Sequence, residues 1–461
     1  MSQSAAAVIA EPARLLPVYG EFDVVVLGGG PAGIAAAAAA ARGGVRVLLI
    51  ERYGFLGGMG TAAGVTNFCG LHANLRGRIR RVVHGVADEL LSRMAALGGL
   101  NEPHLIFGKI HAQAYDTAAF KCAADALLAD HGVALLFHAL AAGVLRASDG
   151  RIEALAIETR SGRMAVRARQ FIDCSGDGDL AHWAGVPTEK GDADGRLLYP
   201  TLMFRVGEVD AGRAQDAWAT IPQRMADAEA AGEFRFPRRG AIVRPQKHAY
   251  EWRVNVTQLK NADGSAVDGT DASALSAAEV EGRRQVVDYL RFLRTKVPGF
   301  ENAYVLDVAP QLGIRETRRL LGEYVLSQDD VLGCADFDDS IGVNGWPLEK
   351  HVAGDVLWEW PPIPQSRGYN QLPYRMLLPR RAAAGGVDNL LVAGRCASMT
   401  HEGQSAARVS GACFVMGHAA GAAAALACRD GGSPHDVDVH ALQQVLRAQG
   451  AFLGDEGELP D

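Results

Sequence analysis

The chain has 461 residues, of which 48% are hydrophobic, and its formal net charge is −7. This length allows two or three structural units with a large core, and the acidic balance argues against nucleic acid as the main partner. The seven cysteines include no C-x-x-C pair, so we expect reduced thiols in a cytoplasmic protein, without a disulfide framework, an iron–sulfur cluster or a metal site.

Residues 1–20 are predicted to form a flexible arm. No basic residue precedes Ala5–Ile9, and the long apolar run of an export signal is missing. The apolar runs Ile34–Ala41 and Ala419–Ala427 are shorter than the roughly 20 residues that a transmembrane helix needs. We therefore expect no association with a membrane.

A strand, a glycine-rich turn, a helix and a second strand follow one another in residues 22–50. Phe22–Leu27 and Val45–Ile50 are continuous apolar runs, and Ile34–Arg42 is rich in Ala. Strands that are apolar on both faces are typical of a parallel sheet covered by helices. This order of elements predicts a βαβ unit.

The turn in this unit, Gly28-Gly29-Gly30-Pro31-Ala32-Gly33, matches the G-x-G-x-x-G fingerprint of dinucleotide-binding folds. Gly28 allows the tight turn, Gly30 lets the backbone approach a pyrophosphate, and Gly33 lets the helix pack against the strand. Glu51, directly after the second strand, can accept hydrogen bonds from both ribose hydroxyls. NAD and FAD folds share this fingerprint, so it predicts a dinucleotide without choosing between them.

Further elements are predicted in the next 120 residues. Helices are expected at Val83–Leu97 and Thr117–Asp130, and a short strand at Val133–Phe137. Turn signals at Asp149-Gly150 and Ser161-Gly162 then separate the three strands of a meander, and one more apolar strand follows. These four strands are Ala142–Arg146, Ile152–Thr159, Met164–Ala168 and Phe171–Asp173.

The pattern changes at about residue 190, where mixed strands and helices with more Arg and Trp begin. The earlier style returns with an apolar strand at Asn389–Ala393 and a helix of small residues at Gly411–Cys428. We predict a discontinuous dinucleotide-binding domain, residues 21–190 plus 385–430, interrupted by a substrate or cap domain at 191–384. An acidic tail, residues 431–461, is expected to hold a short helix near His440–Arg447.

Several separated blocks resemble the FAD-dependent oxidoreductases with a glutathione-reductase-type FAD-binding fold. The resemblance covers nearly the whole chain and implies a glutathione-reductase-like α/β Rossmann domain that binds FAD, with an inserted α+β cap. The blocks are Glu51–Met59, Ile172–Leu180, Gly313–Arg318, Leu372–Arg375, Asn389–Arg395 and His401–Gly421.

The resemblance also implies which residues bind FAD. The cofactor would pass Gly57, Gly58 and Met59, and Ala141 would touch the adenine through its backbone. The helix from about Val409 would direct its positive end at the flavin, because reduced flavin carries negative charge near N1. Besides Gly28, Gly30, Gly33 and Glu51, the remaining positions assigned to FAD are Pro31, Ala32, Arg52, Gly176, Asp177, Gly394 and Arg395.

The source of electrons is left open by the sequence. Residues 190–385 contain no second dinucleotide fingerprint, so a dedicated NAD(P)H domain is not expected. Electrons would leave or arrive through the substrate, oxygen, transiently bound NAD(P)H or a partner protein. The cap and the tail could support a homodimer, but nothing in the sequence fixes the oligomeric state.

Two candidates for catalysis are His401 and Tyr374. His401 precedes the helix that faces the flavin, where it could act as an acid or a base; a hydrogen-bonded structural histidine is the alternative. Tyr374, together with Arg375, follows Pro373 on the segment that returns from the predicted cap. There it could line the pocket.

The third candidate, Arg315, belongs to a cluster with Glu316, Arg318 and Arg319. At helical spacing these side chains could share a face, with Glu316 paired to one arginine. A solvated or domain-bridging network is one interpretation of the cluster. The other is that an arginine clamps a substrate carboxylate.

Two further groups of residues could act on the flavin or on the substrate. Cys69 and His72 follow the glycines that would cross the flavin, and covalent attachment to either residue is open. A basic stretch after residue 234 usually indicates a solvated face, but it could attract an acidic substrate. Its members are Arg235, Arg238, Arg239, Arg244 and Lys247.

The sequence thus predicts an FAD-dependent oxidoreductase that transfers hydride between a small substrate and flavin N5. An anionic substrate is one option. The first alternative is a non-redox flavin-fold enzyme resembling thiazole synthases, which would be shorter, or tRNA-modifying flavoproteins, which would be more basic. A non-catalytic FAD-binding protein is the second. The third, an NAD-dependent dehydrogenase, lacks support because no nicotinamide-domain pattern is present.

Overall fold

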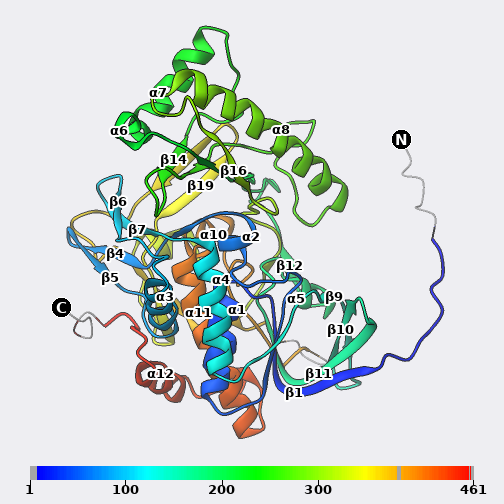
Figure 1. Cartoon of the computed structure of the whole chain (residues 1–461). Coiled ribbons are helices and arrows are strands. Elements are labelled where there is room, and N and C mark those ends of the chain that lie inside the picture. Colours follow the sequence, from blue (N-terminus) through cyan, green and yellow to red (C-terminus); the bar gives the residue numbers. More distant parts are fainter. Residues whose placement is uncertain (1–7, 382–385, 456, 458–461) are drawn as a thin grey trace.

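The computed structural model describes residues 8–381, 386–455 and 457 (Figure 1). Residues 8–17 have no regular structure and are almost all exposed. The first strand, β1 (Val18–Leu27), begins before the predicted end of the N-terminal arm at residue 20, because Val18 already pairs with Ala165. The rest of that arm, residues 1–7, lies outside the described residues.

A seven-stranded sheet, which we call the main sheet, forms the base of the molecule. Its order is β8-β2-β1-β11-β10-β9, with β22 also paired to β11. The pairs among β8, β2, β1, β11 and β22 are parallel, whereas β11, β10 and β9 are antiparallel neighbours. Besides β1, the strands are β2 (Val47–Ile50), β8 (Ala134–Leu136), β9 (Leu140–Arg146), β10 (Ile152–Thr159), β11 (Gly162–Asp173) and β22 (Leu390–Val392).

The predicted α/β fold with a parallel sheet is confirmed, but one strand assignment was wrong. Met164–Ala168 and Phe171–Asp173 were expected as separate strands, and the structure joins them in the single strand β11. Its first half pairs with β10, and its second half continues between β1 and β22. The meander is therefore an extension of the main sheet.

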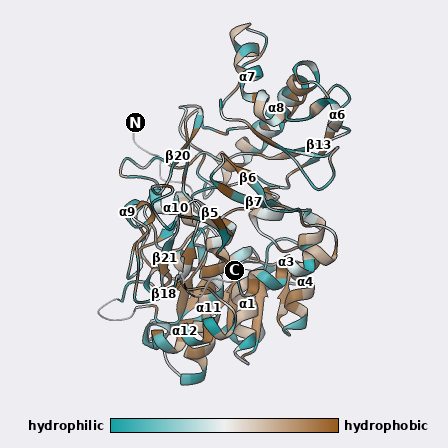
Figure 2. Cartoon of the chain, turned by 90° about the vertical axis from the view of Figure 1, so that its left-hand side faces the viewer, coloured by the Kyte–Doolittle hydropathy of each residue, from teal (hydrophilic) through white to brown (hydrophobic). Residues whose placement is uncertain are grey.

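Two helices that are distant in sequence pack closely over the main sheet (Figure 1). They are α1 (Pro31–Arg42) and α11 (Ser410–Asp430). A Cβ on Gly417 would lie 2.0 Å from the carbonyl oxygen of Ala32, so the two backbones nearly touch. Figure 2 shows how hydrophobic both helices are. Beside them lie α3 (Val86–Ala96) and α4 (Thr117–Asp130).

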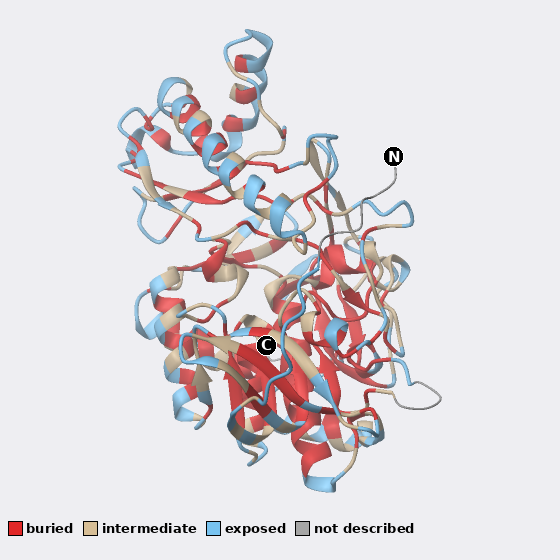
Figure 3. Ribbon diagram, turned by 90° about the vertical axis from the view of Figure 1, so that its right-hand side faces the viewer, coloured by how far each residue is buried: buried red, intermediate tan, exposed pale blue. Residues whose placement is uncertain are grey.

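The helix α11 is longer than the apolar run predicted from sequence. Among the described residues, it is the one helix whose length and composition would allow it to cross a membrane. However, 94% of its most apolar window is buried inside the protein. Figure 3 shows the dense buried core of which it is part. Its apolar character is therefore explained by its position in the core.

A second, antiparallel sheet has the order β14-β15-β13-β16, and we call it the cap sheet. Its own hydrophobic core runs from Leu202 to Leu312 and lies at the top of Figure 1. The strands are β13 (Phe204–Gly207), β14 (Ile242–Pro245), β15 (Trp252–Asn255) and β16 (Tyr304–Val308). The helices are α6 (Ala211–Ala214), α7 (Ala217–Ala230) and α8 (Ala272–Lys296).

Residues after the cap sheet return to the main body. Buried side chains between Leu326 and Leu378 pack in the same core as α1 and α11. The hydrophobic core of the cap sheet therefore ends well before residue 384. The predicted domain boundaries stay a prediction. The elements here are β17 (Arg319–Leu320), paired with β12 (Thr188–Glu189), then α9 (Gln328–Leu332), β18 (Ser340–Asn344), β19 (Leu348–Val352), β20 (Asp355–Glu359), β21 (Asn370–Pro373) and the 3-10 helix Tyr374–Leu377.

Short elements complete the structure. The predicted helix of the acidic tail is present as α12 (Val439–Ala448), preceded by a 3-10 turn at Pro434–Asp436. The others are α2 (Met59–Ala62), α5 (Asp179–Trp183), α10 (His401–Ala407), β3 (Asn67–Phe68), β4 (His72–Leu75), β5 (Arg78–Arg81), β6 (His104–Ile106) and β7 (Ile110–Ala114).

Candidate functional site

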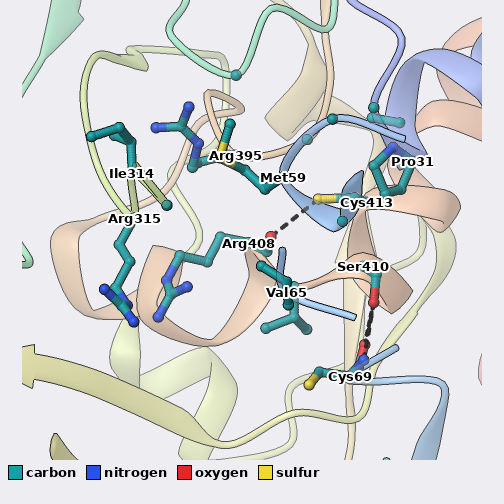
Figure 4. Close-up of a pocket in the computed structure, with 18 of the residues that line it drawn as sticks. Pro31, Met59, Val65, Cys69, Ile314, Arg315, Arg395, Arg408, Ser410 and Cys413 are labelled. Atoms are coloured by element: carbon teal, nitrogen blue, oxygen red, sulfur yellow. Dashed lines mark hydrogen bonds between the residues drawn. The ribbon is translucent and has the colours of Figure 1, made fainter. Parts of the chain in front are cut away.

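One cavity of about 320 Å³ is lined by residues from both the main body and the cap sheet. Two sets of lining residues differ in character, and part of each is drawn in Figure 4. The glycine wall consists of Gly28–Ala32, Glu51, Gly58, Met59, Gly176, Gly394, Arg395 and Val409. The arginine wall consists of Arg244, Arg253, Arg315, Glu349, His351 and Arg408.

The glycine-rich turn fits tightly everywhere except at its middle glycine. A Cβ on Gly28, which has a φ of +98°, would lie 2.4 Å from the carbonyl oxygen of Cys174. A Cβ on Gly33 would lie 1.8 Å from the carbonyl oxygen of Gly28. At Gly30 the nearest atom would be the Cα of Gly58 at 3.7 Å, and Gly30 lines the cavity. The turn therefore leaves room for a ligand only at Gly30.

The helices α1 and α11 both begin at the cavity without a capping side chain. Their N-cap residues, Gly30 and Val409, line the cavity and make no side-chain cap hydrogen bond. By contrast, α4 and α8 are capped by the side chains of Asp116 and Asp271. Uncapped N–H groups and the positive end of a helix attract anions. The cavity thus offers two places suited to the negative charges of a dinucleotide.

Glu51 holds the position predicted for a ribose acceptor. It follows β2, is 6% exposed and lines the cavity. Its Oε2 accepts a hydrogen bond from the backbone N–H of Gly29 at 2.7 Å, and its Oε1 accepts one from Tyr53 N–H at 3.0 Å. These bonds fix the carboxylate beside the turn. The neighbouring Arg52 also lines the cavity and donates to Gln311 at 3.1 Å.

The segment predicted to cross the flavin is pressed against the glycine-rich turn. Gly57 donates its N–H to the carbonyl oxygen of Gly29 at 2.8 Å, and it is not among the described lining residues. Gly58 and Met59 do line the cavity. A Cβ on Gly58, whose φ is +52°, would lie 2.7 Å from the Cα of Gly30. Glycine is needed here for both conformation and close approach.

A buried polar network joins the end of β11 to the segment after β22. Asp173 is completely buried, and its burial raises the pKa of its carboxyl group to about 6. Asp177 accepts from Arg395 Nη2 and from the Thr317 hydroxyl, both at 2.9 Å. The predicted FAD-binding residues of this region that line the cavity are Ala141, Gly176, Gly394 and Arg395. Asp177 is not among the described lining residues, and it binds the guanidinium group of Arg395.

Of the three residues predicted for catalysis, two lie away from the described lining of the cavity. Tyr374 is 2% exposed and donates its hydroxyl to the carbonyl oxygen of Pro434 at 2.7 Å, so it packs in the core instead of lining the pocket. His401 begins α10 and lies 2.9 Å from Oε2 of the buried Glu316. This short contact with a buried carboxylate supports the structural interpretation of His401.

Arg315 does line the cavity, but the helical cluster predicted around it is wrong. Only Arg319 has regular structure, in β17, and the other members lie in an irregular segment. Arg319 is buried against Glu316, whereas Arg315 donates to Tyr199 O and Thr201 Oγ1, both at 2.7 Å. Burial and the nearby charge of Arg408 hold the pKa of Arg315 well below its ordinary value.

The structure places the members of the basic stretch in different environments, and it does the same with the two residues considered for covalent attachment of the flavin. Arg238 is 1% exposed and Arg244 lines the cavity, so a fully solvated stretch is excluded. Cys69 lines the cavity, and burial raises the pKa of its thiol to about 12. His72 lies in β4, where burial and His111 lower its pKa to about 4, and it is not among the described lining residues.

Sequence reasoning missed Arg253, Glu349 and His351. Glu349 accepts from His351 Nε2 and from Trp346 Nε1, both at 2.9 Å. Burial raises the pKa of Glu349, but its hydrogen bond with His351 and the charge of Arg408 outweigh this effect and bring the value to about 2. The one available signal was the presence of charged residues beside apolar ones in the short segments Trp252–Asn255 and Leu348–Val352.

Comparison with known proteins identifies a family. A family model described as FAD dependent oxidoreductase matches residues 23–446. A search of curated proteins found no match. Among solved structures, a geranylgeranyl bacteriochlorophyll reductase-like protein from Thermoplasma acidophilum has a TM-score of 0.46 at 15% identity, over 94% of this chain and 84% of that one.

A second solved structure is p-nitrophenol 4-monooxygenase from Pseudomonas putida, with a TM-score of 0.45 at 12% identity, over 95% of this chain and 91% of that one. A flavin-dependent brominase has a TM-score of 0.44 at 12% identity, over 93% and 83%. Similarities this distant say nothing about the substrate. The fit of the cavity to FAD rests on Gly30, on the two uncapped helices and on Glu51.

Proposed function

Because this chain belongs to the FAD dependent oxidoreductase family, we propose that it transfers hydride between a small organic substrate and the N5 atom of FAD. The observation that carries the proposal is the composition of one cavity. The same space is lined by the dinucleotide turn, with Gly30, and by side chains of the cap sheet, such as Arg253. A substrate on the arginine wall would therefore share this space with the cofactor.

Bound FAD would supply the two-electron chemistry. The protein's part is to hold the cofactor and to stabilise its negative charge after reduction. The uncapped N-terminus of α11 at Val409 suits that task because the positive end of a helix dipole favours nearby negative charge. The cap sheet and the segment with β19 and β20 would select and orient the substrate.

Aromatic residues at one end of the cavity would limit the access of water. Phe107 and Trp358 both line the cavity, with ring centroids 5.0 Å apart. Phe107 is 55% exposed, so this pair marks the solvent side. Behind it, Trp346 lies 6.0 Å from Trp358 between ring centroids. The arrangement suits a substrate that enters past Phe107 and stops against the arginine wall.

The electron acceptor or donor is not specified by these residues. If the substrate gives hydride to the flavin, oxygen or a partner protein would take the electrons from the reduced flavin. If the substrate takes hydride from the flavin, NAD(P)H or a partner protein would reduce the flavin again.

The first experiment is to record the visible spectrum of the purified protein before and after heat precipitation. We expect flavin bands that appear in the supernatant as free FAD. Anaerobic screening of small amines, hydroxy acids and amino acids should then find a compound that bleaches the bands. A protein that stays colourless with added FAD would contradict the proposal, and colour that stays with the pellet would indicate covalent attachment and direct attention to Cys69.

A further inference from the structure

The arginine wall contains part of a row of three arginines on neighbouring strands. In the cap sheet, Arg244 lies opposite Arg253, and Arg253 lies opposite Arg205. Side chains directly opposite one another stand on the same face of an antiparallel pair, and like charges in such positions destabilise it. The row therefore costs stability unless negative charge is brought near it.

Within the described part of the chain, only one member of this row has a carboxylate partner. Arg205 lies 3.5 Å from Asp307 and 3.6 Å from Glu251, and it is not among the described lining residues of the cavity. Arg244 instead stacks over the ring of Trp218, at 4.2 Å from its centroid. The unbalanced end of the row is thus the end that faces the cavity.

Arg253 is the most enclosed member of the row. It is 4% exposed and donates from Nη1 to the carbonyl oxygen of Val65, and no ion pair is formed with it among the described residues. Its Nε is buried without a hydrogen-bond partner. A buried donor without a partner destabilises the folded protein, and a charged donor does so more strongly. An acceptor supplied by a ligand in the cavity would remove that cost.

Two more arginines enter the same cavity from other segments. Figure 4 shows Arg315 and Arg408 with their guanidinium groups pointing in the same direction. Arg408 donates from Nη2 to the carbonyl oxygen of Glu349 at 3.2 Å, and its Nε is also buried without a partner. After burial, the charge of Arg408 is the largest cause that lowers the pKa of Arg315. The two groups therefore repel each other.

The carboxylate of Glu349 offsets only part of this charge. It is bound by His351 and Trp346, and among the described residues it forms no ion pair within 4 Å with any of the four cavity arginines. Its charge acts on Arg253, Arg315 and Arg408 from a longer distance, one negative group against four positive ones. The FAD pyrophosphate is predicted to lie at the glycine wall. Figure 4 draws Pro31 of that wall on the opposite side of the view from Arg315. We therefore assign the arginine wall to a different anion.

We propose that the arginine wall binds the carboxylate of the substrate, with Arg253 and Arg408 as the contacting groups and Arg244 and Arg315 adding to the attraction. Planar guanidinium forks match a planar carboxylate through paired hydrogen bonds. Trp346 and Trp358 offer aromatic surface in the same cavity for the rest of the molecule. The substrate class is a small carboxylic acid with an apolar or aromatic body, an assignment that rests on the proposed function.

The test uses the FAD-loaded protein and two probes of the same shape, benzoate and its neutral amide, benzamide. Bound FAD is first quantified from the visible spectrum, and each probe is then titrated while the flavin bands and the heat of binding are followed. We expect saturable binding of benzoate, with benzamide at least about tenfold weaker because it lacks the charge. Equal affinities for the two probes would overturn the proposal.

Variants then locate the binding site. Arg253→Gln should weaken benzoate binding by about tenfold or more while the FAD content stays at the parent level. Arg205→Gln, in the same row but already balanced by Asp307, should leave benzoate binding unchanged. If Arg253→Gln does not fold, Arg408→Gln makes the same test. Unchanged benzoate affinity in a folded, FAD-loaded Arg253 or Arg408 variant would overturn the assignment.

Inorganic phosphate and sulfate separate a carboxylate site from a general oxyanion site. We expect both to compete with benzoate only weakly, and tighter binding of either would overturn the carboxylate class. The measured FAD content keeps the two proposals apart. A protein without FAD contradicts the proposed function, whereas an FAD-loaded protein that ignores benzoate contradicts only the inference about the substrate.

Discussion

The two walls of the cavity are built by different physical means. The glycine wall uses backbone: a turn open at Gly30 and the uncapped ends of α1 and α11. The arginine wall uses charged side chains, which come from β14, β15, β19 and the irregular segments at Arg315 and Arg408. A backbone site binds what many proteins bind, such as a dinucleotide, while a side-chain site can be specific to one chain. The difference indicates that the backbone of the glycine wall would bind the cofactor and that the side chains of the arginine wall would select the substrate.

The largest expected effect separates arginines that support the structure from those that face the cavity. Arg319, 1% exposed, is bound to Glu316 and donates to Met399 O and Gly191 O, both at 2.9 Å. Arg319→Met should lower the free energy of unfolding by about 3–5 kcal/mol, because it removes the one arginine that is paired with the buried carboxylate of Glu316 among the described residues. Urea denaturation measures this change. The control is the surface variant Arg283→Met, which should change stability by less than about 1 kcal/mol; a similarly small loss for Arg319→Met would contradict the assignment.

The second prediction tests the glycine wall directly. A Cβ at Gly30 meets no protein atom closer than 3.7 Å, but it projects where a ligand would approach the turn. Gly30→Ala should therefore fold normally and bind FAD roughly 100-fold more weakly, a change of about 2.7 kcal/mol. Fluorescence titration of the cofactor-free protein with FAD measures this affinity. Gly432→Ala, with no atom within 4 Å of its Cβ, is the control. Wild-type affinity in Gly30→Ala would refute the predicted path of FAD.

A third effect concerns the acid sensitivity of α11, the helix that begins at the glycine wall. His418 on α11 is 3% exposed, and burial lowers its pKa to about 4 from 6.5. The stability that depends on neutral His418 is therefore complete above pH 6.5 and is lost as the pH falls toward 4, by about 2 kcal/mol at pH 5.

His418→Gln should remove this part of the pH dependence. Urea denaturation at pH 7 and pH 5 compares the variant with the parent, and the exposed His440→Gln serves as the control. The parent should lose about 2 kcal/mol more than His418→Gln between the two pH values. Equal losses would show that another group governs the acid response.

The smallest predicted effect also concerns FAD. Glu51→Gln keeps the shape of the side chain but removes the negative charge that favours hydrogen bonds from the ribose hydroxyls. We expect FAD affinity to fall by about tenfold, since hydrogen bonds to charged groups contribute about 1.5–3 kcal/mol and the amide oxygen retains part of this. The exposed Glu102→Gln provides the baseline in the same titration. An affinity equal to that baseline would place the ribose elsewhere.

The glycine wall was largely predictable because its signals are local. A glycine turn between an apolar strand and a helix specifies its own geometry within a few residues, and the helix Thr117–Asp130 was predicted to the residue. The meander was predicted in outline but not its continuation into β11, since pairing between distant strands leaves no local signal.

The arginine wall was not predictable in the same way. Arg253 stands in a short strand and Glu349 in another, and only the folded chain brings both to one cavity. The run from Arg315 to Arg319 shows the opposite failure. Helical spacing was assumed there, yet tertiary contacts of Glu316 with the backbone N–H groups of Gly191 and Leu198 hold the segment in an irregular form.

The contact between α1 and α11 has a consequence for synthesis of the protein. Gly417 and Gly421 meet the carbonyl oxygens of Ala32 and Ala36, so the cofactor side of the cavity is assembled from segments almost 400 residues apart. While the chain leaves the ribosome, the apolar helix α1 after the dinucleotide turn stays uncovered until α11 has emerged. The part of the cofactor site that α11 contributes at Val409 is therefore expected to form only after this helix has been made.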